Sequence, residues 1–312
     1  MSSHSHETGR WSRRACLKWA GAVALWPAMT RAGCPCDDMT DSPPAPKADA
    51  KPLKSLLVCA DPNNLPFSNR AREGFEDRLA QLVAQDLGVE LEYDWLPQRL
   101  GFYRTAFKTF NANLVLAAPV GFDMALTTQP YYRSTYVFVY RKNGGGIRSL
   151  DDPALRSAKI GVTLTGGVNT PPTHALAKRK IIDNVTGFSA FDERDGRPGE
   201  KIIAAVASGA IDVAIAWGPQ AGYFARQQKV ELEVVPVSPE EDTLGTVKLP
   251  FTFGICMAVR RSDKDLRDRI NQIIARRRNA IDRILDDYAV PRLALKSTRH
   301  GTGFDSSGKD GK

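Results

Sequence analysis

Side chains able to hydrogen-bond a small polar ligand gather just after the first apolar strand that the sequence predicts. Asp61, Asn63 and Asn64 follow the apolar residues 56–60, at a strand-to-helix turn. Ligands of α/β proteins bind beyond the carboxyl ends of strands, so we expect these three side chains to face a cleft. A second interpretation stays open, because asparagines at such positions also build turns.

Aromatic side chains elsewhere in the chain could line the same cleft. Phe67, Tyr131, Tyr132 and Trp217 would offer apolar surface together with phenol and indole hydrogen-bond donors. Packing of these rings in the core is the competing interpretation. The complete set of candidate cleft residues is Asp61, Asn63, Asn64, Phe67, Tyr131, Tyr132, Arg133, Thr170 and Trp217.

The residue combinations of a metal site or of a conventional nucleophile are missing from the sequence. Three of the four histidines lie near the termini, so His174 alone lies in the body, which argues against a multi-histidine metal site or a Ser-His or Cys-His pair. Residues 165–170 place a glycine loop before Pro171, which suits either an anion at a helix N-terminus or ordinary capping by Thr170. We expect no enzymatic activity, no cofactor and no metal.

The cysteines allow two interpretations. Cys59 and Cys256 lie within apolar, strand-like runs, where a cysteine is usually a small buried hydrophobe. A disulfide between them is the alternative in an oxidising compartment. Cys34 and Cys36 are separated by one residue, which is not the spacing of redox or zinc motifs.

Strand-like and helix-like segments alternate along the body in two successive units. The first unit has predicted strands at 56–60, 89–95 and 114–118 and helices at 74–87 and 102–110. The second has predicted strands at 159–164, 187–191, 211–217 and 232–237 and helices from 171, at 201–208 and at 219–227. Residues 135–141 and a strand at 251–259 would cross between the units, and one helix at 263–287 would return to the first. This order predicts an α/β clamshell of two domains joined by two extended crossings, with lobe 1 at 56–140 plus 251–291 and lobe 2 at 141–250.

The N-terminal residues are typical of an export signal. Arg13 and Arg14 precede an 11-residue apolar run, as in a twin-arginine signal peptide over 1–33, and that run is too short to span a bilayer. We expect cleavage after residue 32 or 33 rather than lipid attachment at Cys34, a flexible linker over 34–55 and a disordered tail over 292–312. Loss of the signal halves the formal charge of +8, which weakens any case for nucleic acid, and export removes that case.

Six segments carry a resemblance to a known family. They are VCADPNNLPFSN (58–69), GFED (74–77), LTTQPYYRSTYVFVYRK (126–142), NTPPTHALAKR (169–179), IDVAIAWGPQAGYFA (211–225) and RRSD…RRRNAIDRILDDYAVP (260–291). Together they resemble the family 3 periplasmic solute-binding proteins, and more closely the MxaJ/XoxJ type of accessory protein of PQQ-dependent methanol and alcohol dehydrogenases. The resemblance implies a type II periplasmic-binding-protein clamshell. It also implies a non-catalytic periplasmic protein that binds, matures or activates such a dehydrogenase.

The sequence departs from the family at one pair of residues. The family usually has Cys-Asp where Ala112 and Asn113 stand here. If that cysteine pairs in the family with the one at position 59, this chain has lost the bridge.

The resemblance also bears on what the cleft would bind. Amino-acid receptors of family 3 hold the ligand with an arginine before the first crossing and an aspartate that ends a strand of the second lobe. Residues 118–123 contain no arginine, and Trp217 stands where the aspartate is expected. We therefore expect no ordinary amino acid to bind, and the alternative function is an ABC-importer receptor for a small solute of another kind.

Seven arginines gather in the predicted C-terminal helix and just before it. They are Arg260, Arg261, Arg267, Arg269, Arg276, Arg277 and Arg278. A solvated helix face is one interpretation, since aspartates alternate with them. A docking surface for an acidic protein partner is the other.

Overall fold

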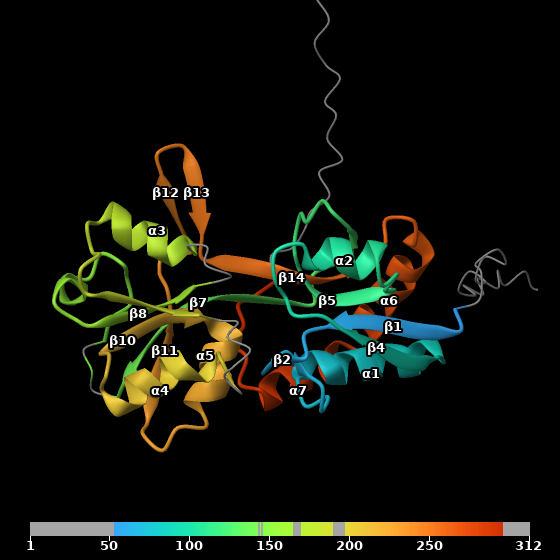
Figure 1. The fold of residues 1–312 in the computed structure, drawn as a ribbon, viewed down its shortest axis with the longest axis horizontal. Coiled ribbons are helices and arrows are strands. Elements are labelled where there is room, and N and C mark those ends of the chain that lie inside the picture. The colour runs from blue at the N-terminus through green and yellow to red at the C-terminus, as the bar shows by residue number, and fades with distance from the viewer. Residues whose placement is uncertain (1–52, 143, 145, 165–169, 190–196, 296–312) are drawn as a thin grey trace, which may run out of the picture. The chain divides into compact units, whose positions relative to one another are not determined.

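The computed structural model describes residues 53–142, 144, 146–164, 170–189 and 197–295 (Figure 1). The predicted signal peptide and nearly all of the predicted linker lie outside these residues. The α-helices are α1 (Phe75–Leu87), α2 (Phe102–Lys108), α3 (Pro171–Lys178), α4 (Glu200–Ser208), α5 (Gly218–Ala225), α6 (Lys264–Arg276) and α7 (Arg278–Asp287). The strands are β1 (Ser55–Ala60), β2 (Asn63–Asn64), β3 (Ser68–Asn69), β4 (Glu90–Trp95), β5 (Leu114–Pro119), β6 (Leu126–Thr127), β7 (Tyr132–Arg141), β8 (Ile160–Leu164), β9 (Val185–Ser189), β10 (Val213–Trp217), β11 (Leu232–Pro236), β12 (Glu241–Leu244), β13 (Val247–Pro250) and β14 (Thr252–Val259).

The first lobe is built on the parallel strands β4, β1 and β5, with β14 antiparallel beside β5. Side chains of a strand alternate between the two faces of a sheet. Val58 accordingly packs in the layer under α1, α6 and α7, whereas Cys59 packs in the layer under α2. Cover on both faces explains the unbroken apolar run of β5.

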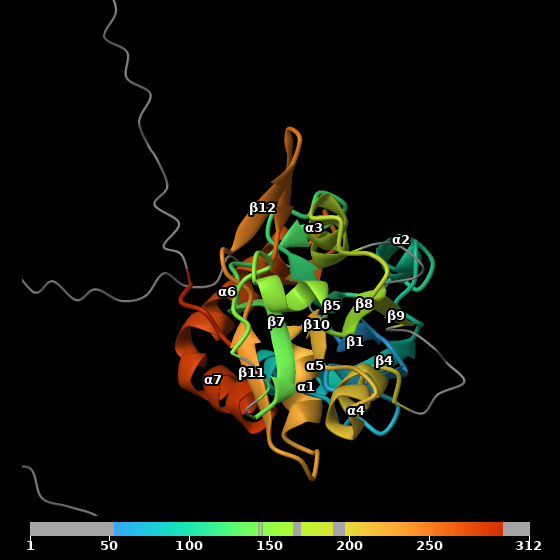
Figure 2. The same ribbon diagram turned by 90° about the vertical axis from the view of Figure 1, so that its left-hand side faces the viewer.

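The second lobe is built on the parallel strands β10, β8 and β9, with β7 antiparallel to both β10 and β11. One layer of its core contains Leu176 of α3, and the other contains Ile203 of α4 and Phe224 of α5. The α/β fold is confirmed, with parallel strands in each lobe joined through the antiparallel β14 and β7 into one ten-stranded sheet. Figure 2 shows the second lobe toward the viewer.

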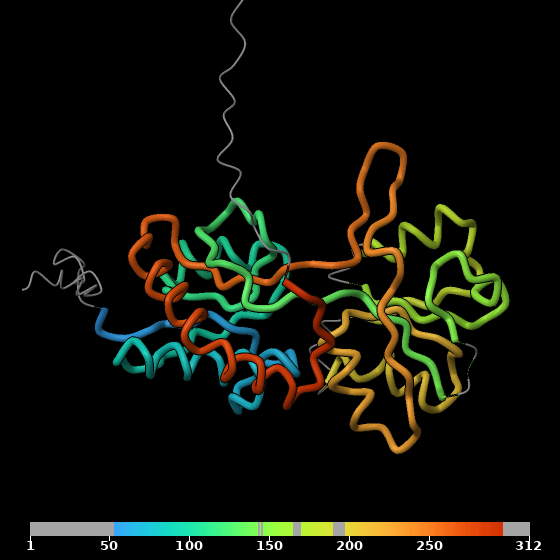
Figure 3. The backbone as a smooth tube through the Cα atoms, turned by 180° about the vertical axis from the view of Figure 1, so that it is seen from behind, coloured from blue at the N-terminus to red at the C-terminus, as the bar shows by residue number. Residues whose placement is uncertain are grey.

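Two long strands connect the lobes. The first half of β7 pairs with β14, and its second half pairs with β10 and β11. The C-terminal segment lies beside this crossing, because the Leu293 N–H donates to the Arg133 carbonyl and the Ser134 hydroxyl donates to the Pro291 carbonyl at 2.6 Å (Figure 3). The exact limits of the two lobes at 140 and 250 remain predictions.

The prediction of a single C-terminal helix at 263–287 is wrong. The helix is interrupted at Arg277, whose φ of −100° and ψ of 14° are not helical. This residue separates α6 from α7. The apolar stripe of α6 includes Ile274 and continues with Ile281 in α7. The spacing of apolar residues therefore does not indicate the interruption. The arginines between these positions turn instead toward acceptors outside the stripe: Arg277 pairs with Asp86 of α1.

The antiparallel hairpin of β12 and β13 was not predicted, because its strands mix charged and apolar residues without a clean alternation. Its turn contains Gly245, which has a φ of +59° that glycine adopts readily. Over the part of the chain that the structure covers, no helix has the length and apolar character needed to cross a bilayer.

Candidate functional site

The loop that follows β1 is organised by Asp61. One carboxylate oxygen accepts the Asn63 backbone N–H at 2.8 Å, and the other accepts the Gln98 N–H at 2.6 Å. The Ser68 hydroxyl donates to the Asp61 carbonyl at 2.9 Å. Asp61 is buried and shapes the turn, a role that the second interpretation gave to the two asparagines.

Asn64 and Leu65, from the same loop, reach the second lobe. The Gln220 side-chain amide of α5 donates to the Asn64 Oδ1 at 3.3 Å, and the Asn64 amide donates to the Gln98 Oε1 at 3.2 Å. Leu65 packs against the core layer that contains Phe224. Asn64, one of the predicted cleft residues, therefore contacts the second lobe directly.

Tyr131 and Tyr132 do not line a cleft, which corrects the first interpretation of these residues. Both are almost fully buried in the core of the first lobe, and the Tyr131 hydroxyl donates to the Leu116 carbonyl at 3.0 Å. Burial raises the pKa of both hydroxyls well above 10. Phe67 also packs inward, with its ring centroid 5.3 Å from that of Phe75.

Trp217 lies where the two crossings meet. Its ring centroid is 5.4 Å from that of Tyr136 in β7 and 5.8 Å from that of Phe253 in β14, in edge-on geometry. The indole is partly buried and packs against the core of the first lobe, although β10 belongs to the second. The ring adds apolar contact at the junction and carries no charge.

The two remaining candidates have protein partners of their own. Arg133 forms an ion pair with Glu240, and its side chain is only 11% exposed. Thr170 is the N-cap residue of α3 and a proline follows it, as the capping interpretation expected, but no backbone N–H of the helix donates to its side chain. The Thr170 hydroxyl donates to the Thr163 carbonyl at 3.2 Å and lies 3.1 Å from the Thr173 hydroxyl. The glycine loop at 165–169 lies outside the described residues.

A buried acidic pair in the first turn of α1 was missed by the sequence analysis. Glu76 is 8% exposed and Asp77 is 4% exposed, and the Glu76 Oε1 has no hydrogen-bond partner. Burial raises the pKa of Glu76 to about 8, with further contributions from the negative charges of Asp77 and Asp61. Burial also raises the pKa of Asp77 to about 6, although its carboxylate accepts the N–H groups of Gly74 and Asn69. Acidic residues commonly occupy a first helical turn and are usually exposed there, so the pattern held no signal of burial.

Cys59 and Cys256 are buried free thiols, so the possible disulfide does not form. Burial is the main cause that raises the pKa of each to about 12. Ala112 shares the core layer of Cys59. Asn113, at the other departure from the family, receives the Leu57 N–H on its side-chain oxygen at 2.8 Å and so extends the pairing of β1.

Most of the arginines in the C-terminal region are paired inside the molecule. Arg276 and Arg277 both contact Asp86. Arg278 pairs with Asp282 and donates to the Tyr131 carbonyl at 2.5 Å. These contacts favour a solvated, internally neutralised face over an electrostatic docking surface.

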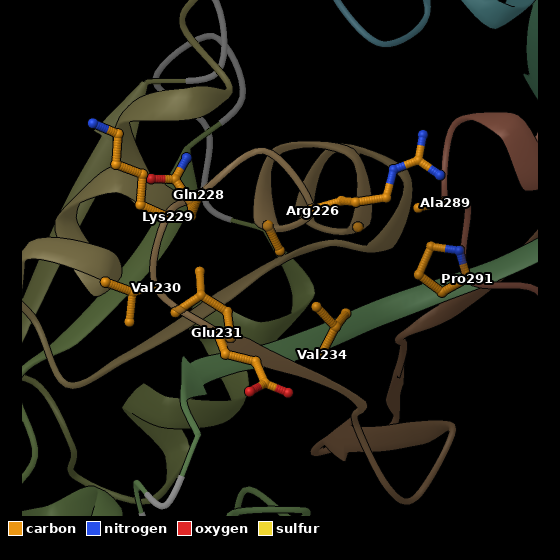
Figure 4. Close-up of a pocket in the computed structure, with 11 residues that line it drawn as sticks. Arg226, Gln228, Lys229, Val230, Glu231, Val234, Ala289 and Pro291 are labelled. Carbon is orange, nitrogen blue, oxygen red and sulfur yellow. The ribbon is translucent and has the colours of Figure 1, made fainter.

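A surface depression of about 510 Å³ lies where the end of α5 and β11 meet the C-terminal segment (Figure 4). Its lining includes the charged residues Arg226, Lys229 and Glu231 and the C-terminal Pro291. None of the predicted cleft residues lines it. Within the described residues, no group of three or more histidine, cysteine or acidic side chains could hold a metal ion.

The sequence and the fold are similar to those of known proteins. No family model matches the sequence. The structure of the periplasmic binding protein XoxJ from Methylobacterium extorquens AM1 is 35% identical, covers 77% of this chain and 100% of its own, and superposes with a TM-score of 0.64. The structure of MxaJ from Methlophaga aminisulfidivorans MPT is 25% identical over 77% of this chain and 100% of its own, with a TM-score of 0.68. Protein MoxJ of Methylorubrum extorquens is 27% identical over 89% of this chain and 96% of that protein.

These structural similarities identify the fold class. An ancestral cationic amino acid solute-binding protein, 21% identical with a TM-score of 0.57 over 75% of this chain and 95% of its own, shares the fold alone. The fold is the type II periplasmic-binding-protein clamshell. At the identity and coverage seen with XoxJ, the chain belongs to the MxaJ/XoxJ family of periplasmic binding proteins.

Proposed function

We propose that this protein is a non-catalytic accessory protein that binds a PQQ-dependent methanol or alcohol dehydrogenase and supports its maturation or activation. Membership of the MxaJ/XoxJ family is the main support. The proposal places the protein in the periplasm, reached through the twin-arginine-type signal at residues 1–33 and without a lipid anchor.

One structural observation favours this function over that of a solute receptor. A receptor for amino acids needs a charged group at the end of a second-lobe strand to pair with the ligand. Trp217 ends β10 instead, and its ring is held between Tyr136 and Phe253. An indole offers one N–H donor and no charge, so the site cannot form that ion pair.

The proposal predicts a direct complex with the dehydrogenase. The test is co-purification of the mature protein with the holoenzyme of the PQQ-dependent methanol dehydrogenase encoded in the same genome, with an unrelated periplasmic protein as the control bait. A stable complex supports the proposal, and no association at either low or moderate ionic strength contradicts it.

The alternative receptor function has its own assay. A solute that binds the folded state stabilises it, by about 2.7 kcal/mol at a hundredfold excess over its dissociation constant. Thermal-shift screening of amino acids, sugars and small organic acids should leave the melting temperature unchanged. A reproducible increase with one solute would favour the importer receptor.

A further inference from the structure

The β12–β13 hairpin projects from the body beyond α3 (Figures 1 and 2). Its register pairs Glu241 with Pro250 and Leu244 with Val247, so the turn contains only Gly245 and Thr246. A two-residue turn with positive φ at its first position matches the natural twist of the flanking strands. The hairpin is thus a regular and short element.

Ion pairs fix the base of this hairpin. Asp242 contacts both Lys178, at 2.7 Å, and Arg179 of α3, and its side chain is only 11% exposed. Burial opposes ionisation of Asp242, but hydrogen bonds from these two cations outweigh it and lower the pKa of Asp242 to about 2. Leu249 is buried in the core of the second lobe. The orientation of the hairpin is therefore set by the body of the protein.

The charged side chains of the hairpin and of Glu240 just before it form ion pairs within the protein. Glu240 pairs with Arg133, and Asp242 pairs with Lys178 and Arg179. Glu241, at the end of β12 farthest from the turn, pairs with Lys248 of β13 at 3.4 Å. On either side of the turn, the exposed side chains include two aliphatic ones.

Two aliphatic side chains flank the turn. Leu244 is 43% exposed and Val247 is 59% exposed, although each side chain is large enough to favour burial. They face each other as a cross-strand pair on either side of the turn. A hairpin whose charges are paired and whose end carries two exposed aliphatic side chains fits an apolar pocket on a protein partner better than it fits an acidic surface.

We propose that Leu244 and Val247 are the anchor by which this protein docks on its dehydrogenase, inserted into an apolar pocket of that enzyme. This inference rests on the proposed function and names the surface that carries it out. The paired arginines of α6 and α7 support the same choice, since their charges are already used within the molecule.

The experiment compares three forms of the mature protein for binding to the immobilised holoenzyme of the methanol dehydrogenase from the same genome. They are the wild type, the double variant Leu244→Thr/Val247→Thr and the control Ile182→Thr. Threonine keeps the β-propensity of the hairpin and removes its apolar end. Ile182 is an exposed aliphatic residue of the second lobe outside the hairpin, at 60% exposure. Circular dichroism and melting temperature verify that all three are folded.

We expect the double variant to bind about tenfold to a hundredfold more weakly, the usual effect of removing an apolar anchor, and Ile182→Thr to bind like the wild type. Binding of the wild type should change little between low and high salt, because the contact carries no net charge.

Equal binding of the wild type and the double variant overturns this inference and leaves the proposed function intact. No binding by the wild type overturns both. Loss of wild-type binding in high salt points to a charged contact and overturns the inference. Binding of the wild type, but not of the double variant, to phosphatidylcholine vesicles would assign the tip to a membrane and also overturn it.

Discussion

Replacement of Glu76 by glutamine should change how the stability of the protein depends on pH. In the unfolded chain this carboxyl releases its proton near its ordinary pKa of 4.5, whereas burial holds the folded pKa at about 8. Between these values the folded state keeps a proton that the unfolded state has lost. The free energy of unfolding therefore falls as pH rises, by up to about 1.4 kcal/mol per pH unit.

Glu76 dominates the window above pH 6.5. Asp77, with a raised pKa of about 6, has lost most of its proton there in the folded state and nearly all of it in the unfolded state. From pH 6.5 to 8 the wild type should lose about 2 kcal/mol through Glu76, which corresponds to roughly 4–8 °C in melting temperature for a body of this size. Glutamine has the shape of the protonated side chain and does not titrate, so Glu76→Gln should lack this loss.

The assay is calorimetric melting of the wild type and Glu76→Gln in buffers from pH 5.5 to 8.5. The quantity to compare is the difference between the two melting temperatures, because titrations elsewhere in the chain affect both proteins alike. Glu90→Gln, at an exposed position of β4, is the matched control and should run parallel to the wild type. Parallel curves for the wild type and Glu76→Gln would refute the assigned proton.

Three further outcomes are expected. At pH 8, peptides carrying Cys59 and Cys256 should stay unmodified by a thiol reagent in the native protein and react after denaturation, as mass spectrometry can measure; native labelling would contradict pKa values raised to about 12. Asp242→Asn should weaken the base of the hairpin by about 1–2 kcal/mol and speed amide hydrogen exchange in β12 and β13; unchanged exchange would mean that the ion pairs do not hold it. Gly222→Ala should destabilise the protein by about 1–3 kcal/mol, because its new methyl group would lie 2.1 Å from the Ala289 carbonyl oxygen; an unchanged denaturation midpoint would contradict that close approach.

The repeating elements could be predicted because each has a physical pattern in the sequence. The continuous apolar run of β5 indicated cover on both faces, and the one-sided stripe of α1 indicated a helix on a sheet. The break at Arg277 could not be found in the same way. Arg277 contacts Asp86, a residue 191 positions earlier in the chain, and no local sequence pattern indicates such a contact.

The candidate site was harder to predict, because residue type does not determine which way a side chain points. Tyr131 and Tyr132 are as suitable for a binding cleft as for a core, and the pairing of β7 with β14 places them in the core. We expected Asp61 to contact a ligand, but its carboxylate accepts backbone N–H groups that shape the turn after β1. The Asn64–Gln220 hydrogen bond joins two residues that no local pattern relates.

The contacts between the lobes explain why a receptor fold could serve as an accessory protein. A solute shifts a clamshell toward its closed form only by as much as it binds that form more tightly. Here the protein itself supplies contacts at the junction: Asn64 with Gln220, Leu65 against the second lobe, and Trp217 against the core of the first. Such contacts stabilise the arrangement of the lobes with no solute present. A protein that docks on an enzyme needs a surface of fixed shape, and a hairpin anchored to the second lobe gains its defined position from that arrangement.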